Sequence, residues 1–129
     1  MSNVADGRAI PDSGWAVEHS PAANTIATVT KTAPGPGKYH VVTAITVTAR
    51  AGAATAILAK ATLSGNGATG VNWSARVGVA AVIGETCVIA IPGAWRFAAN
   101  EAVTLALDTI PGASNFETVA MTGFVADVL

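Results

Sequence analysis

Val71-Asn72-Trp73-Ser74-Ala75-Arg76-Val77 is the segment that decides the fold, because apolar and polar residues alternate along its whole length. In an extended strand, this alternation places the apolar odd-numbered residues on one face and the polar even-numbered residues on the other. The pattern is typical of an antiparallel strand that packs one face on a core and exposes the other. We therefore predict a half-buried β-strand over residues 71–77, with Trp73 in the core.

Segments of the same kind lie on both sides of residues 71–77. Each is rich in Thr, Val and Ile or alternates with a period of two, and glycine or proline turns separate them. They cover residues 24–31, 39–49, 54–63, 87–91, 101–109 and 116–128, with a short further candidate at residues 95–97. Seven or eight strands at this spacing predict an all-β, antiparallel sandwich or barrel.

Local composition refines three of these segments. Pro92-Gly93 is expected to end the strand that begins at Cys87, and Gly123 is expected to form a β-bulge in the last strand. The Ala-rich residues 51–61 also have helix propensity, but their β-branched residues and flanking glycines favour a strand.

The N-terminal residues 1–23 differ from the rest of the chain. They show no sustained period, and prolines at positions 11 and 21 disfavour regular strand pairing. We predict an extended N-terminal arm over residues 1–23, followed by a β-domain over residues 24–129. The arm still carries Ile10, Trp15 and Val17, which either pack back on their own domain or insert into a neighbouring molecule.

Composition restricts the possible partners. Charged residues make up 12% of the 129 residues, against about 25% in an ordinary soluble domain. A surface covered by Thr, Ser, Asn, Gly and Ala is less costly to desolvate, which favours a protein inside an assembly, although a monomer from a low-charge proteome would look similar. The net charge of −1, with seven dispersed basic residues, argues against a nucleic-acid partner or an anionic membrane partner.

The chain also lacks the sequence marks of export or membrane insertion. Asp6 and Arg8 interrupt the start, so no signal peptide is evident. No segment approaches the ~20 apolar residues that a membrane span needs. We expect synthesis in a cytoplasm without export by this route.

No residue pattern predicts catalysis, a cofactor or a metal. Cys87 is the single cysteine and is expected to be a packed thiol, and His19 and His40 are isolated. Gly65-Asn66-Gly67-Ala68-Thr69-Gly70 matches a dinucleotide-binding pattern, but a strand follows it where a helix is required, so it predicts a hairpin loop. Four carboxylates lie beside turns or on polar faces and are expected to be solvated; they are Glu85, Glu101, Asp108 and Glu117. We predict that the chain is not an enzyme.

Candidate partner-binding residues are the large apolar side chains outside the alternating pattern. Trp15 and Trp95 adjoin a glycine or a loop, so each is either an exposed contact or part of the rim of the core. Apolar residues on both faces of segment 116–128 predict a second buried surface in a homo-oligomer, with Phe116, Phe124 or Val128 at the contact. The full set of candidates is Ile10, Trp15, Val17, Trp95, Phe116 and Phe124.

The strand that begins at Tyr39-His40, the aliphatic-x-Trp-Ser strand at residues 71–74 and the Thr122-Gly123-Phe124 step resemble those of small structural proteins of tailed bacteriophages. The resemblance covers about residues 24–129 and lies closest to capsid decoration (cement) proteins. It implies an antiparallel, jelly-roll-like β-sandwich that forms a homotrimer on the capsid surface of the virion and binds the major capsid protein. It carries over no catalytic residue. The alternative is a phage tail or fibre module that binds host-surface glycans.

Overall fold

The computed structural model describes residues 3–5, 8–10, 14–52, 56–109, 111–112 and 114–129, with side chains from residue 14 onward. These residues form strands and no helix. The strands are β1 (Asn3–Ala5), β2 (Arg8–Ile10), β3 (Gly14–His19), β4 (Thr28–Lys31), β5 (Lys38–Arg50), β6 (Ile57–Gly65), β7 (Val71–Val79), β8 (Thr86–Arg96), β9 (Val103–Leu107) and β10 (Phe116–Asp127).

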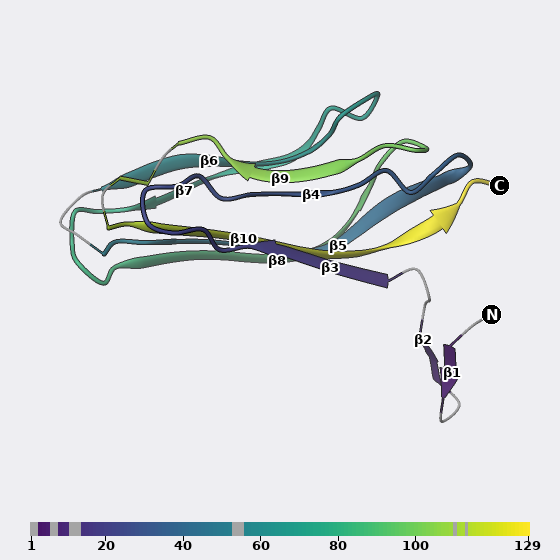
Figure 1. The fold of residues 1–129 in the computed structure, drawn as a ribbon, viewed down its shortest axis with the longest axis horizontal. Coiled ribbons are helices and arrows are strands. Elements are labelled where there is room, and N and C mark those ends of the chain that lie inside the picture. The colour runs from purple at the N-terminus through teal and green to yellow at the C-terminus, as the bar shows by residue number, and fades with distance from the viewer. Residues whose placement is uncertain (1–2, 6–7, 11–13, 53–55, 110, 113) are drawn as a thin grey trace.

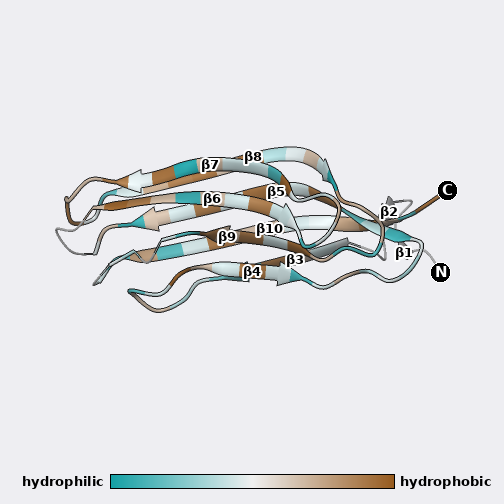
Figure 2. Cartoon of the chain, turned by 90° about the horizontal axis from the view of Figure 1, so that it is seen from above, coloured by the Kyte–Doolittle hydropathy of each residue, from teal (hydrophilic) through white to brown (hydrophobic). Residues whose placement is uncertain are grey.

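Strands β3 to β10 build two stacked antiparallel sheets (Figures 1 and 2). Sheet I has the order β3-β10-β5-β8, and sheet II has the order β4-β9-β6-β7. The β6–β7 connection is a hairpin between neighbours, and every other connection from β3 to β10 crosses to the opposite sheet. This connectivity is that of a jelly roll, an eight-stranded double sheet with Greek-key crossovers. The predicted antiparallel, jelly-roll-like β-sandwich is confirmed.

The core lies between the sheets and follows the predicted alternation. Ile45 and Val47 of β5 face Leu63 of β6 and Leu105 of β9, and each of these side chains is at most 1% exposed. Residues between them in sequence, such as Thr46, point to the outside. Burial of one face therefore fixes the register of the long strands, because a one-residue slip would expose the whole apolar set.

The prediction of an extended arm over residues 1–23 is wrong for its second half, which contains a paired strand. Gly14–His19 forms β3, which pairs with β10 from Phe124 back to Val119 as the edge strand of sheet I. The burial of β3 alternates strictly, with Trp15 and Val17 turned toward the core. The prolines at positions 11 and 21 flank this strand without interrupting it, which is why they do not prevent its pairing. Farther upstream, β1 pairs with β2 in a separate two-stranded sheet.

Pro92-Gly93 does not end a strand, which corrects a second prediction. β8 continues through Arg96, so it includes Trp95 and Arg96 of the candidate strand at residues 95–97. The pairing of β8 with β5 shifts register between Val42 and Ala44, opposite this dipeptide. A proline is tolerated here because β8 is an edge strand, so its missing N–H interrupts no ladder on the outer side.

Two further register shifts mark the strand bends. The predicted bulge is present at Thr122/Gly123 in β10, where a side chain on Gly123 would collide with the Val41 carbonyl and lie 2.6 Å from Trp15 Cζ2. A second bulge between Leu63 and Ser64 turns Val71 outward, to 65% exposure. Val71 is therefore the member of the alternating segment that is not on the predicted face.

Candidate interaction surface

The outer face of sheet I is built from small side chains in register. Across the sheet, Ala16 of β3 pairs with Thr122 of β10, which pairs with Ala44 of β5 and through it Pro92 of β8. Three more rows of outward-facing residues follow along the strands, each two residues from the last. They are Glu18, Ala120, Thr46 and Ala90; then Thr118, Thr48 and Val88; then Phe116, Arg50 and Thr86. We call these residues the sheet I face. In these four rows the charged residues are Glu18 and Arg50, and the next row in register adds the exposed Arg96, which stacks on the Tyr39 ring with its Cζ 4.2 Å from the ring centroid.

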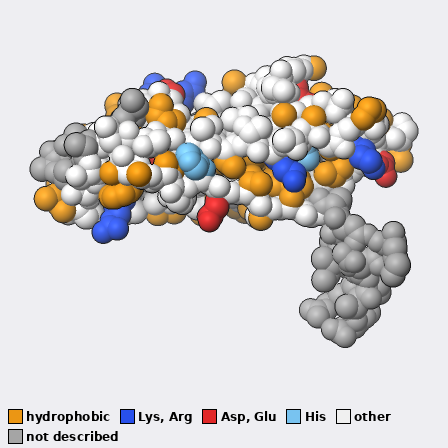
Figure 3. Space-filling model, in the orientation of Figure 1, with side chains coloured by type: hydrophobic (Ala, Val, Ile, Leu, Met, Phe, Trp, Pro, Cys, Tyr) orange, Lys and Arg blue, Asp and Glu red, His pale blue; other side chains and the backbone are white. Residues whose placement is uncertain are grey.

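The centre of the sheet I face is uncharged and consists of small side chains, without large apolar ones. Thr46 and Thr48 of β5 and Thr118 of β10 are partly exposed, and each offers a hydroxyl and a methyl group to a partner. Larger apolar side chains lie toward its edges, where Val88 is 56% exposed and Phe116 is 42% exposed. Figure 3 shows one side of the molecule, where hydrophobic and neutral atoms predominate over charged groups.

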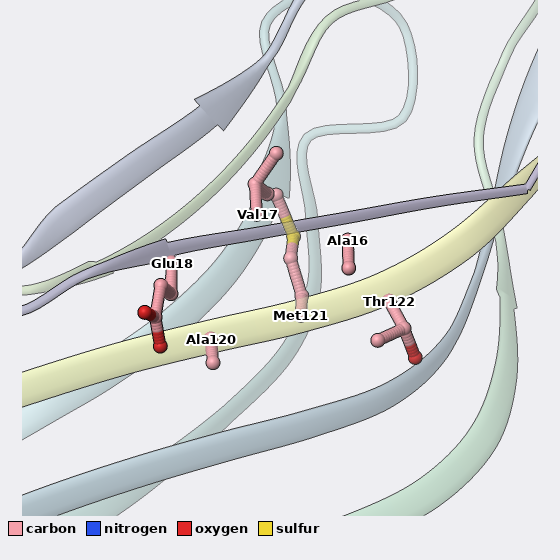
Figure 4. Close-up of a pocket in the computed structure, with 6 residues that line it drawn as sticks. All are labelled: Ala16, Val17, Glu18, Ala120, Met121 and Thr122. Atoms are coloured by element: carbon pink, nitrogen blue, oxygen red, sulfur yellow. The ribbon is translucent and has the colours of Figure 1, made fainter.

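A shallow depression of about 300 Å³ lies on this face between β3 and β10 (Figure 4). The side chains of Ala16, Ala120 and Thr122 line it together with Glu18. Val17 and Met121 complete the lining, and their side chains turn to the opposite side of the sheet, toward each other. The depression exists because two adjacent strands carry alanines at neighbouring positions.

One of the six predicted partner-binding residues lies on the sheet I face, namely Phe116. Trp15, Val17 and Trp95 are partly buried and pack against the core, so they are not exposed contacts. Phe124 is partly buried as well, next to Gly14. The side chain of Ile10 lies outside the described residues.

Trp15 is fixed to its own domain by three contacts. Its ring lies edge-on to His40, with 5.3 Å between the ring centroids, and Lys31 Nζ lies 5.8 Å from the Trp15 ring centroid. The third contact is the Gly123 backbone, where a β-carbon would not fit. The alternative that Trp15 packs back on its own domain is therefore the one the structure shows.

The other tryptophans also form internal contacts. Trp73 and Trp95 contact each other edge-on at 6.4 Å between centroids, and both pack on the core. The prediction that Trp73 is a core residue is confirmed in this partly buried form. A flat, exposed indole that could stack on a sugar is absent from the described residues.

Two carboxyls predicted to be solvated are buried instead. Glu117 of β10 is 1% exposed; its Oε1 accepts a hydrogen bond of 3.1 Å from the Ala27 N–H, and its buried Oε2 has no partner among the described residues. Burial raises the pKa of Glu117; the Ala27 hydrogen bond opposes this effect, and the nearby charge of Asp108 adds to it. This environment favours the neutral acid.

Glu101 is the second buried carboxyl, and its environment acts in the other direction. It lies against the hairpin loop at residues 65–70 and accepts hydrogen bonds from the backbone N–H groups of Thr69 at 3.0 Å and Ala98 at 3.3 Å. Burial opposes ionisation, but the hydrogen bonds from Thr69, Ala98 and Gly67 outweigh it and lower the pKa. Gly65 and Gly67 leave room for this carboxylate, because a β-carbon at either position would displace it. The glycine-rich loop thus accommodates a carboxylate of the chain itself.

Neither carboxyl is part of a reactive cluster. Among the described residues, no group of three or more His, Cys, Asp and Glu side chains is arranged to hold a metal ion. Cys87 is partly buried on the edge strand β8, less enclosed than the packed thiol we predicted. His40 is fully buried, and its Nε2 lies 2.7 Å from the Thr32 carbonyl oxygen. A search for helices able to cross a membrane found none in the described part of the chain.

Comparisons with known proteins leave the family open. No protein-family model matches the chain, and no curated protein matches it. Among solved structures, a carbohydrate-binding module (CBM36) in complex with calcium and xylotriose aligns over 87% of this chain and 88% of its own chain, at 12% sequence identity and a TM-score of 0.38. This similarity is too low to support a functional argument, so the fold assignment rests on the strand order of this chain itself.

Proposed function

We propose that the chain is a structural protein of a tailed-bacteriophage virion: a capsid decoration protein that oligomerises on the head and stabilises contacts between major capsid proteins. The observation that supports this most is the sheet I face, a broad Ala- and Thr-rich surface with Glu18 and Arg50 as its charged residues and Arg96 in the adjoining row. The phage-like sequence features at residues 39–47, 71–74 and 122–124 agree with the proposal.

The physical argument concerns desolvation. Covering a Thr or Ala removes little hydration, whereas covering an unpaired Lys or Glu costs several kcal/mol, by the order of magnitude known for buried charges. Antiparallel geometry makes the face roughly 15–20 Å wide and about 20 Å long. That area, roughly 300–400 Å², is up to about half of the ~800 Å² per partner that stable interfaces bury.

Binding to an assembled shell would stabilise it by mass action. A protein that contacts neighbouring coat subunits binds the assembled shell and not the free subunits, so it shifts the equilibrium toward the shell. A rigid jelly roll suits this role, because its long strands hold the face in one shape and little conformational entropy is lost on binding.

The direct test mixes the purified chain with shells of the major capsid protein encoded in the same genome. We expect the chain to co-sediment with assembled shells, to ignore unassembled coat protein and to raise the temperature at which the shells rupture. Absence of co-sedimentation at saturating concentration contradicts the proposal. Retention on a panel of host-surface glycans, competed by free sugar, would point to the tail or fibre alternative.

A further inference from the structure

The β7–β8 loop presents two large aliphatic side chains from a rigid turn. Val82 is 58% exposed and Ile83 is 69% exposed. Four backbone hydrogen bonds hold the turn. The Gly84 N–H donates to the Ala51 carbonyl at 2.7 Å, and the Ala51 N–H donates to the Glu85 carbonyl at 2.9 Å. The other two lie within the loop, at 2.8 and 3.1 Å. Gly84 adopts a φ of +88°, which suits the tight turn. We call Val82 and Ile83 the loop knob.

Exposed aliphatic side chains on a rigid turn are typical of an interface anchor, because the turn has already lost the conformational freedom that binding would remove. A mobile loop would have to be ordered at that step. The loop knob therefore requires a concave, mostly apolar partner surface.

The same chain carries such a surface on the sheet I face, in the depression between Ala16 and Ala120. The loop knob cannot reach the depression of its own molecule. Arg50, which adjoins Ala51 at the base of the loop, lies opposite Phe116 in β10, four residues along that strand from Ala120. At about 3.4 Å per residue and ~4.8 Å between strands, Arg50 and Glu18 lie about 16 Å apart across the sheet.

The charges beside the two features are complementary. Arg50 adjoins Ala51, to which the loop that carries the knob is hydrogen-bonded, and Glu18 lines the depression. Both side chains are exposed, and neither has an ion-pair partner in the part of the chain that the structure describes. A second copy that brings its knob to the depression would bring an arginine toward the glutamate.

We infer that the chain self-associates by inserting Val82 and Ile83 of one copy into the depression between Ala16 and Ala120 of the next, with Arg50 of the first copy paired with Glu18 of the second. This inference rests on the proposed role in an assembly and specifies its subunit contact. The two surfaces of the contact differ, so it is heterologous, and such contacts close into rings when the rotation permits. The expected homotrimer is a ring of this kind.

The test is a charge exchange measured by analytical ultracentrifugation on the whole chain. We expect the wild type to self-associate, and Glu18→Arg and Arg50→Glu each to weaken association about tenfold by placing like charges together. The double variant should recover to within about threefold of wild type, because the pair is restored in the opposite sense. Lys60→Glu on sheet II is the matched control and should leave association unchanged.

A second variant examines the knob itself. Ile83→Asp should weaken association at least thirtyfold, as truncating or charging a buried anchor commonly does. Its thermal unfolding is recorded alongside. If Ile83→Asp does not fold, the charge exchange decides alone, because positions 18 and 50 are exposed and tolerate substitution.

Three results would overturn the inference: a wild type that remains monomeric up to about 1 mM, single charge variants that associate like wild type, or a double variant that fails to recover. Shell co-sedimentation of the same variants separates this inference from the proposed function. Intact co-sedimentation with unchanged self-association rejects the knob contact alone. Charge variants that lose shell binding but self-associate normally assign Glu18 and Arg50 to the contact with the coat protein and also reject the inference.

Discussion

The two sheets bury similar aliphatic interiors but differ on their outer faces. On the sheet I face, Ala and Thr surround Glu18 and Arg50 at two separate positions, and the other exposed charges of sheet I, Arg96 and the Lys38–Asp127 ion pair, lie toward the other end of its strands. Sheet II places Lys60 beside Arg76 and near Asp108. Polar groups pair on both sheets: Thr30 and Thr104 are hydrogen-bonded at 2.9 Å and Asp108 accepts the Lys60 N–H at 2.8 Å on sheet II, and Thr43 and Thr122 are hydrogen-bonded at 3.2 Å on sheet I. Sheet II also exposes Leu58 and Val71. The sheet I face differs from sheet II in the wide spacing of its charges, and in our proposal it is the face that a partner covers.

The pKa of Asp108 illustrates the same contrast. The Lys60 N–H hydrogen bond lowers it first, the Thr109 hydroxyl contributes, and the charge of Arg76 adds to the effect. Asp108 is thereby kept ionised on an exposed surface. A charged side chain that already has such a partner in its own chain does not indicate an external ligand. Glu18 and Arg50, in contrast, lack ion-pair partners among the described residues.

The largest effect is expected from a lysine at the centre of the sheet I face. Thr46→Lys should reduce shell binding at least a hundredfold, because the ammonium would be buried without a partner at a cost of about 3 kcal/mol. Thr62→Lys, at the corresponding position on sheet II, should bind like wild type. Both variants should keep their melting temperature, since both positions face outward. Equal loss of binding in the two variants would remove the distinction between the faces.

A smaller effect is expected where β3 joins sheet I. Gly123→Ala would place a β-carbon against the Val41 carbonyl and the Trp15 ring, so we expect a loss of about 1–3 kcal/mol in the free energy of unfolding. Ala120→Ser, on the outer face of the same strand, is the control and should change stability by less than ~0.5 kcal/mol. Chemical denaturation measures both. An unchanged Gly123→Ala variant would mean that β3 and Trp15 are held less tightly than their contacts indicate.

The smallest effect distinguishes the two buried carboxyls by pH. The pKa of Glu117 is raised in the folded state, so the folded protein binds more protons between the unfolded and folded pKa values, and stability falls as pH rises through that interval. Glu117→Gln keeps an acceptor for the Ala27 N–H and should remove this decline, with a gain of about 1–2 kcal/mol at neutral pH. Denaturation at a series of pH values measures it.

Glu101 should behave in the opposite way. Its pKa is lowered in the folded state, so its stabilising contribution is present above the unfolded pKa and is lost as pH falls through the folded value. Glu101→Gln should therefore destabilise the protein at neutral pH. Identical pH profiles for the Glu117 and Glu101 variants would contradict the assigned environments.

The sequence was informative where structure depends on neighbouring residues. Alternation identified the core strands, and Ile45, Leu63 and Leu105 are buried as expected, because the side of a strand that faces the core follows a local period. Low charge predicted an assembly surface only in general terms. The surface that we propose for this role could be identified only from the strand order, since Ala16, Ala44 and Ala120 come together from distant parts of the chain.

The failures share a physical cause, which is pairing over long sequence separations. β3 is held by β10, about a hundred positions later, and its short period of two was masked by nearby prolines. Glu117 is buried because it receives the N–H of Ala27, 90 positions away, and Glu101 is buried under a loop 32 positions away. No local pattern separates these residues from the exposed Glu85. The glycine-rich loop indicates that Glu101 is buried only once the topology shows that the loop lies against it.

The course of β8 through Pro92-Gly93 has a consequence for solubility. An eleven-residue edge strand is a template on which another chain can add by main-chain pairing, the first step of fibril growth. Pro92 removes one donor from that edge, and the irregular pairing with β5 beside it distorts the row of remaining groups. If many copies gather on one particle, as we propose, this edge should resist open-ended polymerisation while side-chain contacts between copies remain possible.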